Sequence, residues 1–301
     1  MISVLTPNYN HSKFIKERLD SILCQTLQDF ELIILDDCSN DDSRDIIERY
    51  RHLKNVSIHY NAKNSGSPFK QWKKGIELAK GDYIWIAESD DVAEPTFLET
   101  MVQKLKAGHG LAYCRSGDIN ENGGKKSDFF WADGLDEKRW KSDFENAGVE
   151  EIKNYLIYRN TIPNASACVF EKKFASLNCG FEKMRFCGDW LFWIKLLENT
   201  SVAYTSETLS HFRHHGSSTR NQKTPKEELK KKLEIISIIE STRKKNNLGM
   251  LSTDEFTNYD WVTKGFYRQL IIPEKLKDQI IFYSNRYFPN MYSRYRKVTF
   301  R

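Results

Sequence analysis

Three carboxylates follow directly after a short apolar segment in this chain of 301 residues. Residues 83–87 carry no charge and are rich in β-forming residue types, and Glu88, Asp90 and Asp91 come next. Two carboxylates about 5 Å apart repel each other by roughly 3 kcal/mol at an effective dielectric constant near 20. A divalent cation would turn that repulsion into binding, so the pattern predicts a metal site at the end of a strand.

An alternation of strand and helix patterns over the first 115 residues predicts the elements that position this cluster. Strands are expected at 2–6, 31–36, 56–60, 82–87 and 111–115, with helices at 12–25, 42–51, 69–80 and 95–107. This alternation indicates an α/β fold, with helices flanking a mostly parallel sheet. In such sheets, ligands bind outside the carboxyl ends of the strands.

The chain changes character after residue 115. Residues 117–148 lose their periodicity and are expected to form a long functional excursion. Further elements are expected as a helix at 149–159, a strand at 165–171, a helix from Asp189, a strand at 202–214 and helices at 224–245 and 254–270. Thr224 and Glu227 form a capping-box pattern at the start of the first of these last two helices.

Two other polar segments are expected at the same sheet edge as the acidic cluster. The first strand runs into Pro7, Asn8 and Tyr9, and the second runs into Asp36 and Asp37. Taken alone, Pro7 and Asn8 are typical of a turn, and the two aspartates are typical of residues that cap a helix. Taken together, three adjacent strand ends converge on one crevice.

The order and spacing of these segments resemble a known family. The matching segments are 3–10, 21–26, 30–37, 64–66, 75–81 and 88–91. They resemble the large inverting family 2 of glycosyltransferases with the GT-A fold, and the resemblance extends over about residues 1–220. It implies a Rossmann-like mixed sheet, a nucleotide-sugar donor that is usually a UDP or dTDP sugar, and Mn²⁺ or Mg²⁺ as cofactor.

The resemblance also implies roles for residues on the donor side. Pro7 and Tyr9 match the loop that contacts the base, and Asp37 matches the acid that receives the ring N–H of uracil. Asp90 matches the metal-binding last acid of the DxD-type motif. Glu88 stands where the family usually has aspartate, which lengthens the arm toward the ribose or the sugar.

Further donor contacts are expected within the matching segments, from Asn8, Ser65 and Ser89. Lys70 or the amides near Ser65 could contact donor phosphate. The alternative, which we favour for Lys70, is a helix with Trp72 buried and its lysines in solvent.

Two later residues complete the site that the resemblance implies. Asp189 precedes Trp190 where the family has its catalytic base, although from spacing alone an N-cap is the simpler interpretation. His215 matches a histidine expected near the metal or the diphosphate, with His214 facing elsewhere. In isolation, two adjacent histidines indicate only an exposed pair.

Composition is that of a globular protein, with 40% hydrophobic and 29% charged residues. Neither a membrane-spanning run nor a secretory leader is evident, so we expect a cytoplasmic protein. The six cysteines form no Cys-x-x-Cys pair and are expected to be reduced. The net charge of +5 gathers late, in 223–245 and 286–301, which favours an anionic partner.

Three functions compete at this point. The first is transfer of a sugar to a hydroxyl of a glycan or lipid-linked acceptor, in bacterial surface polysaccharide synthesis. A nucleotidyltransferase would need a glycine-rich phosphate loop, and residues 6–12 contain no glycine. The third function is a binding module, which would use the basic and aromatic residues of 286–301. These residues could bind a membrane surface or nucleic acid, and we favour peripheral membrane contact.

The resulting domain prediction has two parts. Residues 1–220 form the glycosyltransferase domain, divided into a nucleotide-sugar-binding part (1–115) and an acceptor part (116–220). Residues 221–301 form a helical C-terminal extension.

Overall fold

The computed structural model describes residues 1–127, 131–216 and 224–248. The chain divides into two compact units, Met1–Ser218 and Thr219–Arg301, and each is described by itself. The predicted division at residue 220 falls among residues that are not described, and the further division of the first domain stays a prediction.

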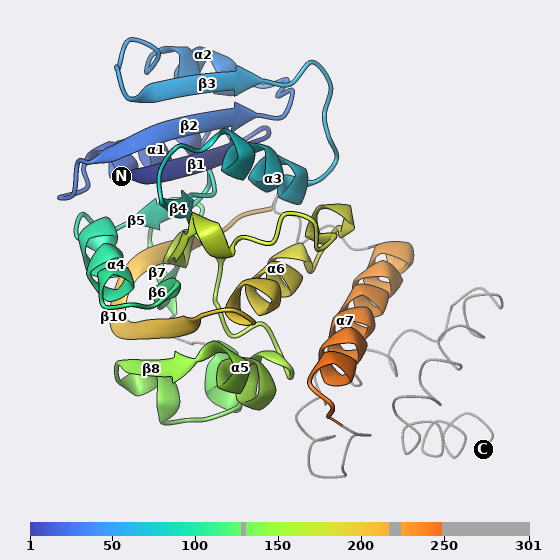
Figure 1. Ribbon diagram of the computed structural model, residues 1–301. Helices are drawn as coiled ribbons and strands as arrows, with labels where there is room; N and C mark the ends of the chain where they lie inside the picture. The colour runs from blue at the N-terminus through green and yellow to red at the C-terminus, as the bar shows by residue number, and fades with distance from the viewer. Residues whose placement is uncertain (128–130, 217–223, 249–301) are drawn as a thin grey trace. The chain divides into compact units, whose positions relative to one another are not determined.

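The first unit contains a sheet whose ten strands all lie within the described residues (Figure 1). The strands are β1 (Ile2–Asn8), β2 (Phe30–Asp36), β3 (Val56–Tyr60), β4 (Tyr83–Ile86), β5 (Val92–Ala93), β6 (Leu111–Asn120), β7 (Lys125–Ser127), β8 (Phe144–Ala147), β9 (Cys168–Glu171) and β10 (Ser201–His214). Their order is β3-β2-β1-β4-β9-β6-β10-β5, with β7 beside β6 and β8 beside β10. Strands β3, β2, β1 and β4 run parallel, whereas β9 lies antiparallel between β4 and β6.

Helices cover both faces of this sheet. They are α1 (Ile15–Leu23), α2 (Ser43–Glu48), α3 (Pro68–Leu78), α4 (Phe97–Lys106), α5 (Gly148–Glu151) and α6 (Gly188–Leu197). Apolar side chains of α1, α2 and α4 share one core cluster with alternate residues of the strands, such as Val4 and Ile34. The expected mixed Rossmann-like sheet flanked by helices is therefore confirmed.

Helix α3 packs on the opposite face, and a glycine lets it approach closely (Figure 1). A Cβ at Gly75 would lie 2.8 Å from Leu35 Cδ1 and 3.0 Å from a Leu5 methyl carbon. Real Cβ atoms essentially never lie as close as 2.8 Å, so a larger residue here would force the leucine side chains or the helix to shift. Nearer the start of α3, Gln71 donates to Asp37 at 2.9 Å, so the helix begins beside the carboxyl end of β2.

Several predicted elements differ from the observed ones. Strand β6 runs five residues beyond the predicted end at 115, because β10 pairs with it as far as Asn120. The predicted helix at 149–159 is the short α5 followed by a π-helical segment, Ile152–Leu156. The strand predicted to start at 165 begins only at Cys168, because Ala165–Ala167 form a short 3-10 helix before β9.

Helix α7 (Pro225–Lys245) belongs to the second unit, and its predicted capping box is confirmed. The Thr224 side chain accepts from the Glu227 backbone N–H, and the Glu227 carboxylate accepts from the Thr224 backbone N–H. The helix predicted at 254–270 lies outside the described residues. Within the described part, no helix combines the length and apolarity that a bilayer crossing requires.

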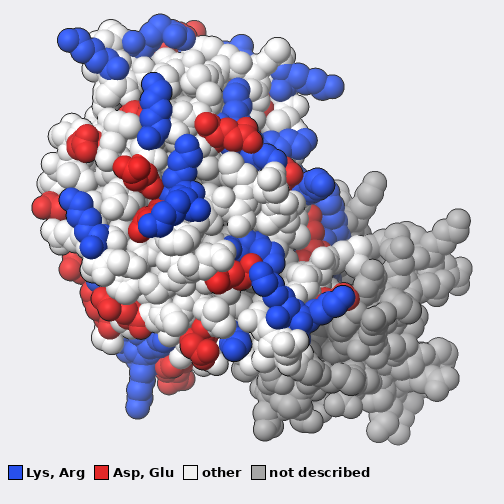
Figure 2. Space-filling model, in the orientation of Figure 1, with Lys and Arg blue, Asp and Glu red and all other residues white. Residues whose placement is uncertain are grey.

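Charge is mixed on the face drawn in Figure 2, where Lys and Arg side chains alternate with Asp and Glu side chains over the described part of the chain. The positive tail predicted at 286–301 lies outside the described residues. The six cysteines are all free, as expected.

Candidate active site

Three parallel strands bring their carboxyl ends to one edge, as the sequence predicts. Strand β1 lies between β2 and β4, with Asn8 in register with Asp36. Pro7 and Asn8 are the last residues of β1 and do not form the turn that the pair suggests in isolation. Asp36 ends β2, and α2 is preceded by Asp42, so neither Asp36 nor Asp37 is its N-cap.

The loop after β4 gives each of its three carboxylates a different partner. The indole N–H of Trp72 donates to Glu88 at 2.7 Å, and His215 Nε2 lies 2.9 Å from Asp90 Oδ2. Asp91 is buried and accepts the backbone N–H of Arg213 at 3.0 Å. Arg213 lies in β10 and His215 directly after it, so these two contacts tie the end of β10 to the acidic loop.

Two histidines set the pKa of Asp90 apart from those of Glu88 and Asp91. Burial raises the pKa of Glu88 to about 8 and that of Asp91 to about 7, and the charge of Asp90 adds to both shifts. Burial would also raise the pKa of Asp90, but the hydrogen bond with His215 and the charge of His11 bring it below its usual value. Asp90 is therefore the carboxylate that stays ionised, the form in which a carboxylate binds a metal.

A fully buried arginine lies behind this loop. Arg18 of α1 stacks its guanidinium over the Trp85 ring at 4.6 Å, and none of its side-chain nitrogens has a hydrogen-bond partner among the described residues. Burial lowers its pKa to about 10, and the charges of Asp91, Asp90 and Glu88 oppose that shift. Arg18 is thus an internal countercharge to the acidic loop.

Three potential metal ligands gather at this edge. His11, Asp90 and His215 each offer a ligand atom, and these atoms lie within 4.8 Å of one another. His11 Nδ1 is also 2.7 Å from the Ser89 hydroxyl, and burial lowers the pKa of the His11 ring. A carboxylate and two imidazoles fit a divalent cation, because both donor types bind such ions in proteins.

The adjacent histidines His214 and His215 lie in different environments, as predicted. The His215 side chain is 1% exposed and contacts Asp90, whereas the His214 side chain is 37% exposed and its Nε2 lies 3.1 Å from Asp118. Arg213 holds the segment in place, because its guanidinium donates to the carbonyl oxygen of Asp90 and pairs with Glu17.

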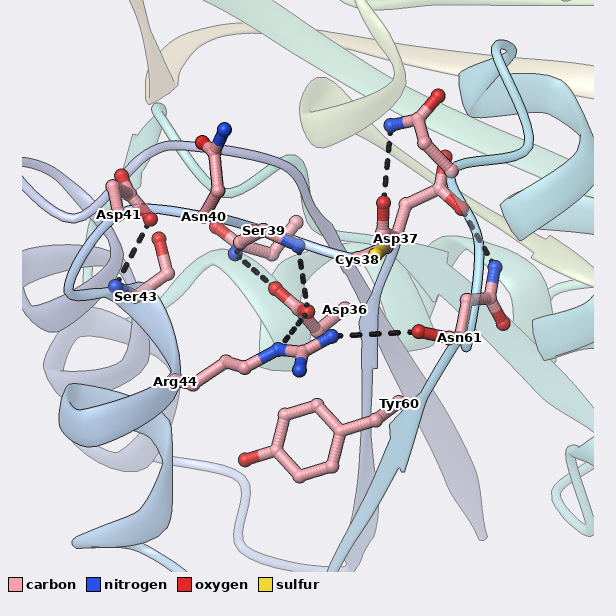
Figure 3. A network of polar contacts seen from close by, with 12 residues as sticks. Asp36, Asp37, Cys38, Ser39, Asn40, Asp41, Ser43, Arg44, Tyr60 and Asn61 are labelled. Carbon is pink, nitrogen blue, oxygen red and sulfur yellow. Dashed lines mark hydrogen bonds and ion pairs between the residues drawn. The ribbon is translucent and has the colours of Figure 1, made fainter.

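Asp36 and Asp37 organise a polar network at the end of β2 (Figure 3). Asp36 accepts three hydrogen bonds at 3.0 Å, from Asn8 Nδ2, the Ser39 backbone N–H and Arg44 Nε. Asp37 accepts from Asn61, from the Ser65 backbone and hydroxyl, and from Gln71, at 2.6 to 3.0 Å. Such bonds fix the Asp37 carboxylate in one orientation.

The predicted donor residues therefore lie around one edge. Asn8 is buried and its Oδ1 has no partner among the described residues, while Tyr9 is 46% exposed. Ser65 and Ser89 are both engaged, with Asp37 and His11 respectively. Lys70 donates to the carbonyl oxygen of Ser65 at 2.9 Å. The donor-binding roles of these residues stay predictions.

Asp189 lies in the first turn of α6, where the helix macrodipole favours a negative charge. The N-cap is Cys187, without a side-chain cap, so the N-cap interpretation of Asp189 is wrong. The carboxylate is positioned from outside the helix instead, because Asn160 Nδ2 donates to its Oδ2 at 2.9 Å. Asp189 as catalytic base stays a prediction.

The 3-10 segment before β9 is tied to the acidic loop, because the Ser166 hydroxyl accepts the Glu88 backbone N–H at 3.1 Å. The start of α6 lies close to the start of α3. A Cβ at Gly188 would lie 2.6 Å from the Phe69 ring, so glycine is required where α6 meets the start of α3.

Sequence reasoning missed His11, Arg18, Trp72 and Ser166 as parts of this edge. His11 directly follows the segment 3–10 at the end of the first strand. Extending the strand-end argument by one residue would have included it. Asn10 has a φ of 55°, a left-handed conformation that asparagine tolerates in turns. No pattern in the sequence distinguishes Arg18 from an exposed helix residue.

Comparisons with known proteins bear on this arrangement. The profile described as "Glycosyl transferase family 2" matches residues 3–162. Glycosyltransferase GlyG of Streptococcus pneumoniae is 36% identical over 106 residues, which is 35% of each chain. The putative teichuronic acid biosynthesis glycosyltransferase TuaG of Bacillus subtilis is 35% identical over 104 residues, which is 34% of this chain and 41% of TuaG. The chain thus matches only about a third to two fifths of the length of these relatives.

A solved structure agrees in fold over a much longer stretch. The crystal structure of residues 1–349 of TarS from Staphylococcus aureus superposes with a TM-score of 0.66 at 17% identity, covering 96% of this chain and 82% of that one. The same part of TarS was also solved with UDP and with UDP-GlcNAc. At this identity the likeness establishes the fold, which is the GT-A fold. With the family profile matching more than half of the sequence, the chain belongs to glycosyltransferase family 2.

Proposed function

We propose that the chain transfers one sugar from a UDP or dTDP sugar to a hydroxyl of a glycan or lipid-linked acceptor, with inversion at the anomeric carbon. The observation that carries this proposal is the approach of His215 Nε2 to within 2.9 Å of Asp90 Oδ2. The two residues are 125 positions apart and meet at the strand-end edge where ligands of parallel sheets bind.

The metal would be Mn²⁺ or Mg²⁺, held by Asp90 and His215. Both side chains are largely shielded from solvent, and the carboxylate is the ionised one of its cluster. A divalent cation at this place would neutralise charge on the departing nucleotide diphosphate. Glu88, directed by the Trp72 indole, would accept hydroxyls of the ribose or the sugar.

Asp189 would act as the base. Inversion needs a carboxylate on the acceptor side to take the proton of the attacking hydroxyl while the nucleotide leaves from the opposite face of the sugar. Asn160 donates to one carboxylate oxygen, and the adjacent Gly188 packs closely against Phe69 at the start of α3. Asp189 would receive the proton on a carboxylate oxygen.

The nucleotide would be selected by the residues around β1 and β2. The exposed ring of Tyr9 offers a surface for the base, and the fixed Asp37 carboxylate would accept a ring N–H. The UDP and UDP-GlcNAc complexes of TarS support a UDP sugar, and the TuaG likeness supports synthesis of a bacterial surface polysaccharide.

The partner surface would be a membrane rather than nucleic acid. Residues 286–301 combine five Lys or Arg residues with aromatic ones, a composition suited to the anionic inner face of a membrane. This would place a cytoplasmic enzyme next to lipid-linked acceptors. Salt-sensitive binding to vesicles containing anionic lipid, with no binding to RNA, is the expected result, and the reverse result would contradict it.

The proposed activity is tested with a panel of UDP, dTDP and GDP sugars in the presence of Mn²⁺ or Mg²⁺, read by thermal shift and by donor hydrolysis. We expect a UDP or dTDP sugar to raise the melting temperature only with metal present. Asp90→Ala should abolish this metal-dependent shift, whereas Asp82→Ala, an exposed acid just before β4, should keep it. Absence of a response to every donor would contradict the proposed function, and the anomeric configuration of the product tests inversion.

A further inference from the structure

We propose that His11 is a third protein ligand of the divalent cation and that the resulting set of two imidazoles and one carboxylate selects Mn²⁺ over Mg²⁺. This inference rests on the metal site proposed above and adds a residue from a different part of the chain. With His11, the site would prefer Mn²⁺ over Mg²⁺ more strongly than Asp90 and His215 alone would.

The first support is the place of His11 at the strand-end edge. The residue follows β1 after the left-handed turn at Asn10, and its Nδ1 lies 2.7 Å from Ser89 Oγ, between Glu88 and Asp90 in the acidic loop. A histidine that binds a metal commonly has its other ring nitrogen fixed by a hydrogen bond. With Nδ1 engaged by Ser89, Nε2 is the nitrogen available for coordination.

The second support is the distance between the three groups. Ligand atoms of His11, Asp90 and His215 all lie within 4.8 Å of one another. Ligands about 2.1 Å from one ion lie roughly 3 to 4 Å apart. The three side chains therefore need to close by only about 1 Å to share an ion.

The third support is the way in which the two imidazoles are packed. The rings of His11 and His215 lie 5.3 Å apart at 88°, and the Phe14 ring contacts both, at 5.9 and 4.7 Å between ring centroids. An aromatic wall on one side limits how far either ring can turn. Two histidines held in this way next to an ionised carboxylate form a ligand set rather than a pair of surface residues.

The chemistry of that set decides which metal it prefers. Mg²⁺ prefers oxygen ligands, whereas imidazole nitrogen suits transition metals, and Mn²⁺ accepts both. A second imidazole therefore strengthens Mn²⁺ binding more than Mg²⁺ binding. The alternative is that His11 only orients Ser89, in which case it contributes no nitrogen to the ion.

Pulsed electron paramagnetic resonance of Mn²⁺ bound to the full chain distinguishes these cases. With ¹⁵N-labelled histidine, the spectrum reports how many imidazole nitrogens bind the ion. We expect two in the wild type, one in His11→Asn, one in His215→Asn and two in the matched control His214→Asn. The wild-type count needs no variant, so it remains decisive if His11→Asn fails to fold.

Affinity is the second readout, measured by titrating Mn²⁺ with and without UDP and by competing it with Mg²⁺. Loss of a residue that only orients a ligand costs about 10- to 100-fold in metal affinity, so His11→Asn should weaken Mn²⁺ binding by more than about 100-fold. It should also lower the preference for Mn²⁺ over Mg²⁺ by at least about tenfold. One imidazole in the wild type, or unchanged selectivity in His11→Asn, would overturn the role of His11 alone. No Mn²⁺ binding by the wild type, with or without UDP, would overturn the proposed metal site itself.

Discussion

The two sides of the candidate site are built differently. The proposed donor side consists of residues at or just after the ends of parallel strands, where Asp36, Asp37 and Asp91 are buried and accept hydrogen bonds. The proposed acceptor side has Asp189 on a helix that follows irregular segments, and Asn160 from another loop donates to it. The first group is thus held by the sheet, whereas the second is held by contacts between irregular segments.

The substitution Asp189→Asn distinguishes the proposed acceptor side from the proposed donor side most clearly. Removing a general base slows its reaction by about 10²- to 10⁴-fold. We expect a loss of transfer in that range, while UDP binding measured by calorimetry stays near the wild-type value. Full transfer activity in the variant would show that the base lies elsewhere.

Arg18 is the buried countercharge of the acidic loop, so removing its charge should destabilise the fold. Losing one partner of a buried set of charges costs about 3 to 5 kcal/mol. Arg18→Met keeps most of the side-chain volume and should lower the free energy of unfolding by that amount in urea at neutral pH. Lys16→Met, on the same helix but exposed, is the control and should change it by less than about 0.5 kcal/mol. Equal effects of the two substitutions would rule out the countercharge role.

Asn160→Ala tests how far the acceptor side depends on one contact. A hydrogen bond to a charged group contributes about 1.5 to 3 kcal/mol, which corresponds to a roughly 10- to 100-fold change. We expect kcat to fall by that factor with an unchanged KM for the donor, because the base is misplaced and the nucleotide site is not. A raised donor KM with an unchanged kcat would instead connect Asn160 to the donor side.

The smallest effect is expected from Lys70→Ala. The Lys70 ammonium group is engaged with the Ser65 carbonyl oxygen at an exposed position, and exposed contacts of this kind contribute little. UDP affinity should change by less than about threefold. A tenfold loss would mean that Lys70 contacts the donor phosphate, the option that we did not favour.

The prediction of the strand-end edge depended on short-range patterns. Apolar segments such as 83–87 end in polar residues, and in a parallel sheet those ends must meet at one edge. The acidic loop and the convergence of three strands were therefore foreseeable from the residues, whereas the different surroundings of His214 and His215 were implied only by the family resemblance. The extension of β6 to Asn120 was not, because only its pairing with β10 keeps that polar stretch in a strand.

The sequence by itself determined the order of strands and helices, the edge at which the carboxylates emerge and the family to which their spacing belongs. Only the tertiary structure decided which of these acids stays ionised, because burial, His215 and Arg18 act on Asp90 and its neighbours from distant parts of the chain. It also decided that His11 joins Asp90 and His215, since a distance of a few ångströms between residues 11, 90 and 215 exists only after the chain has folded.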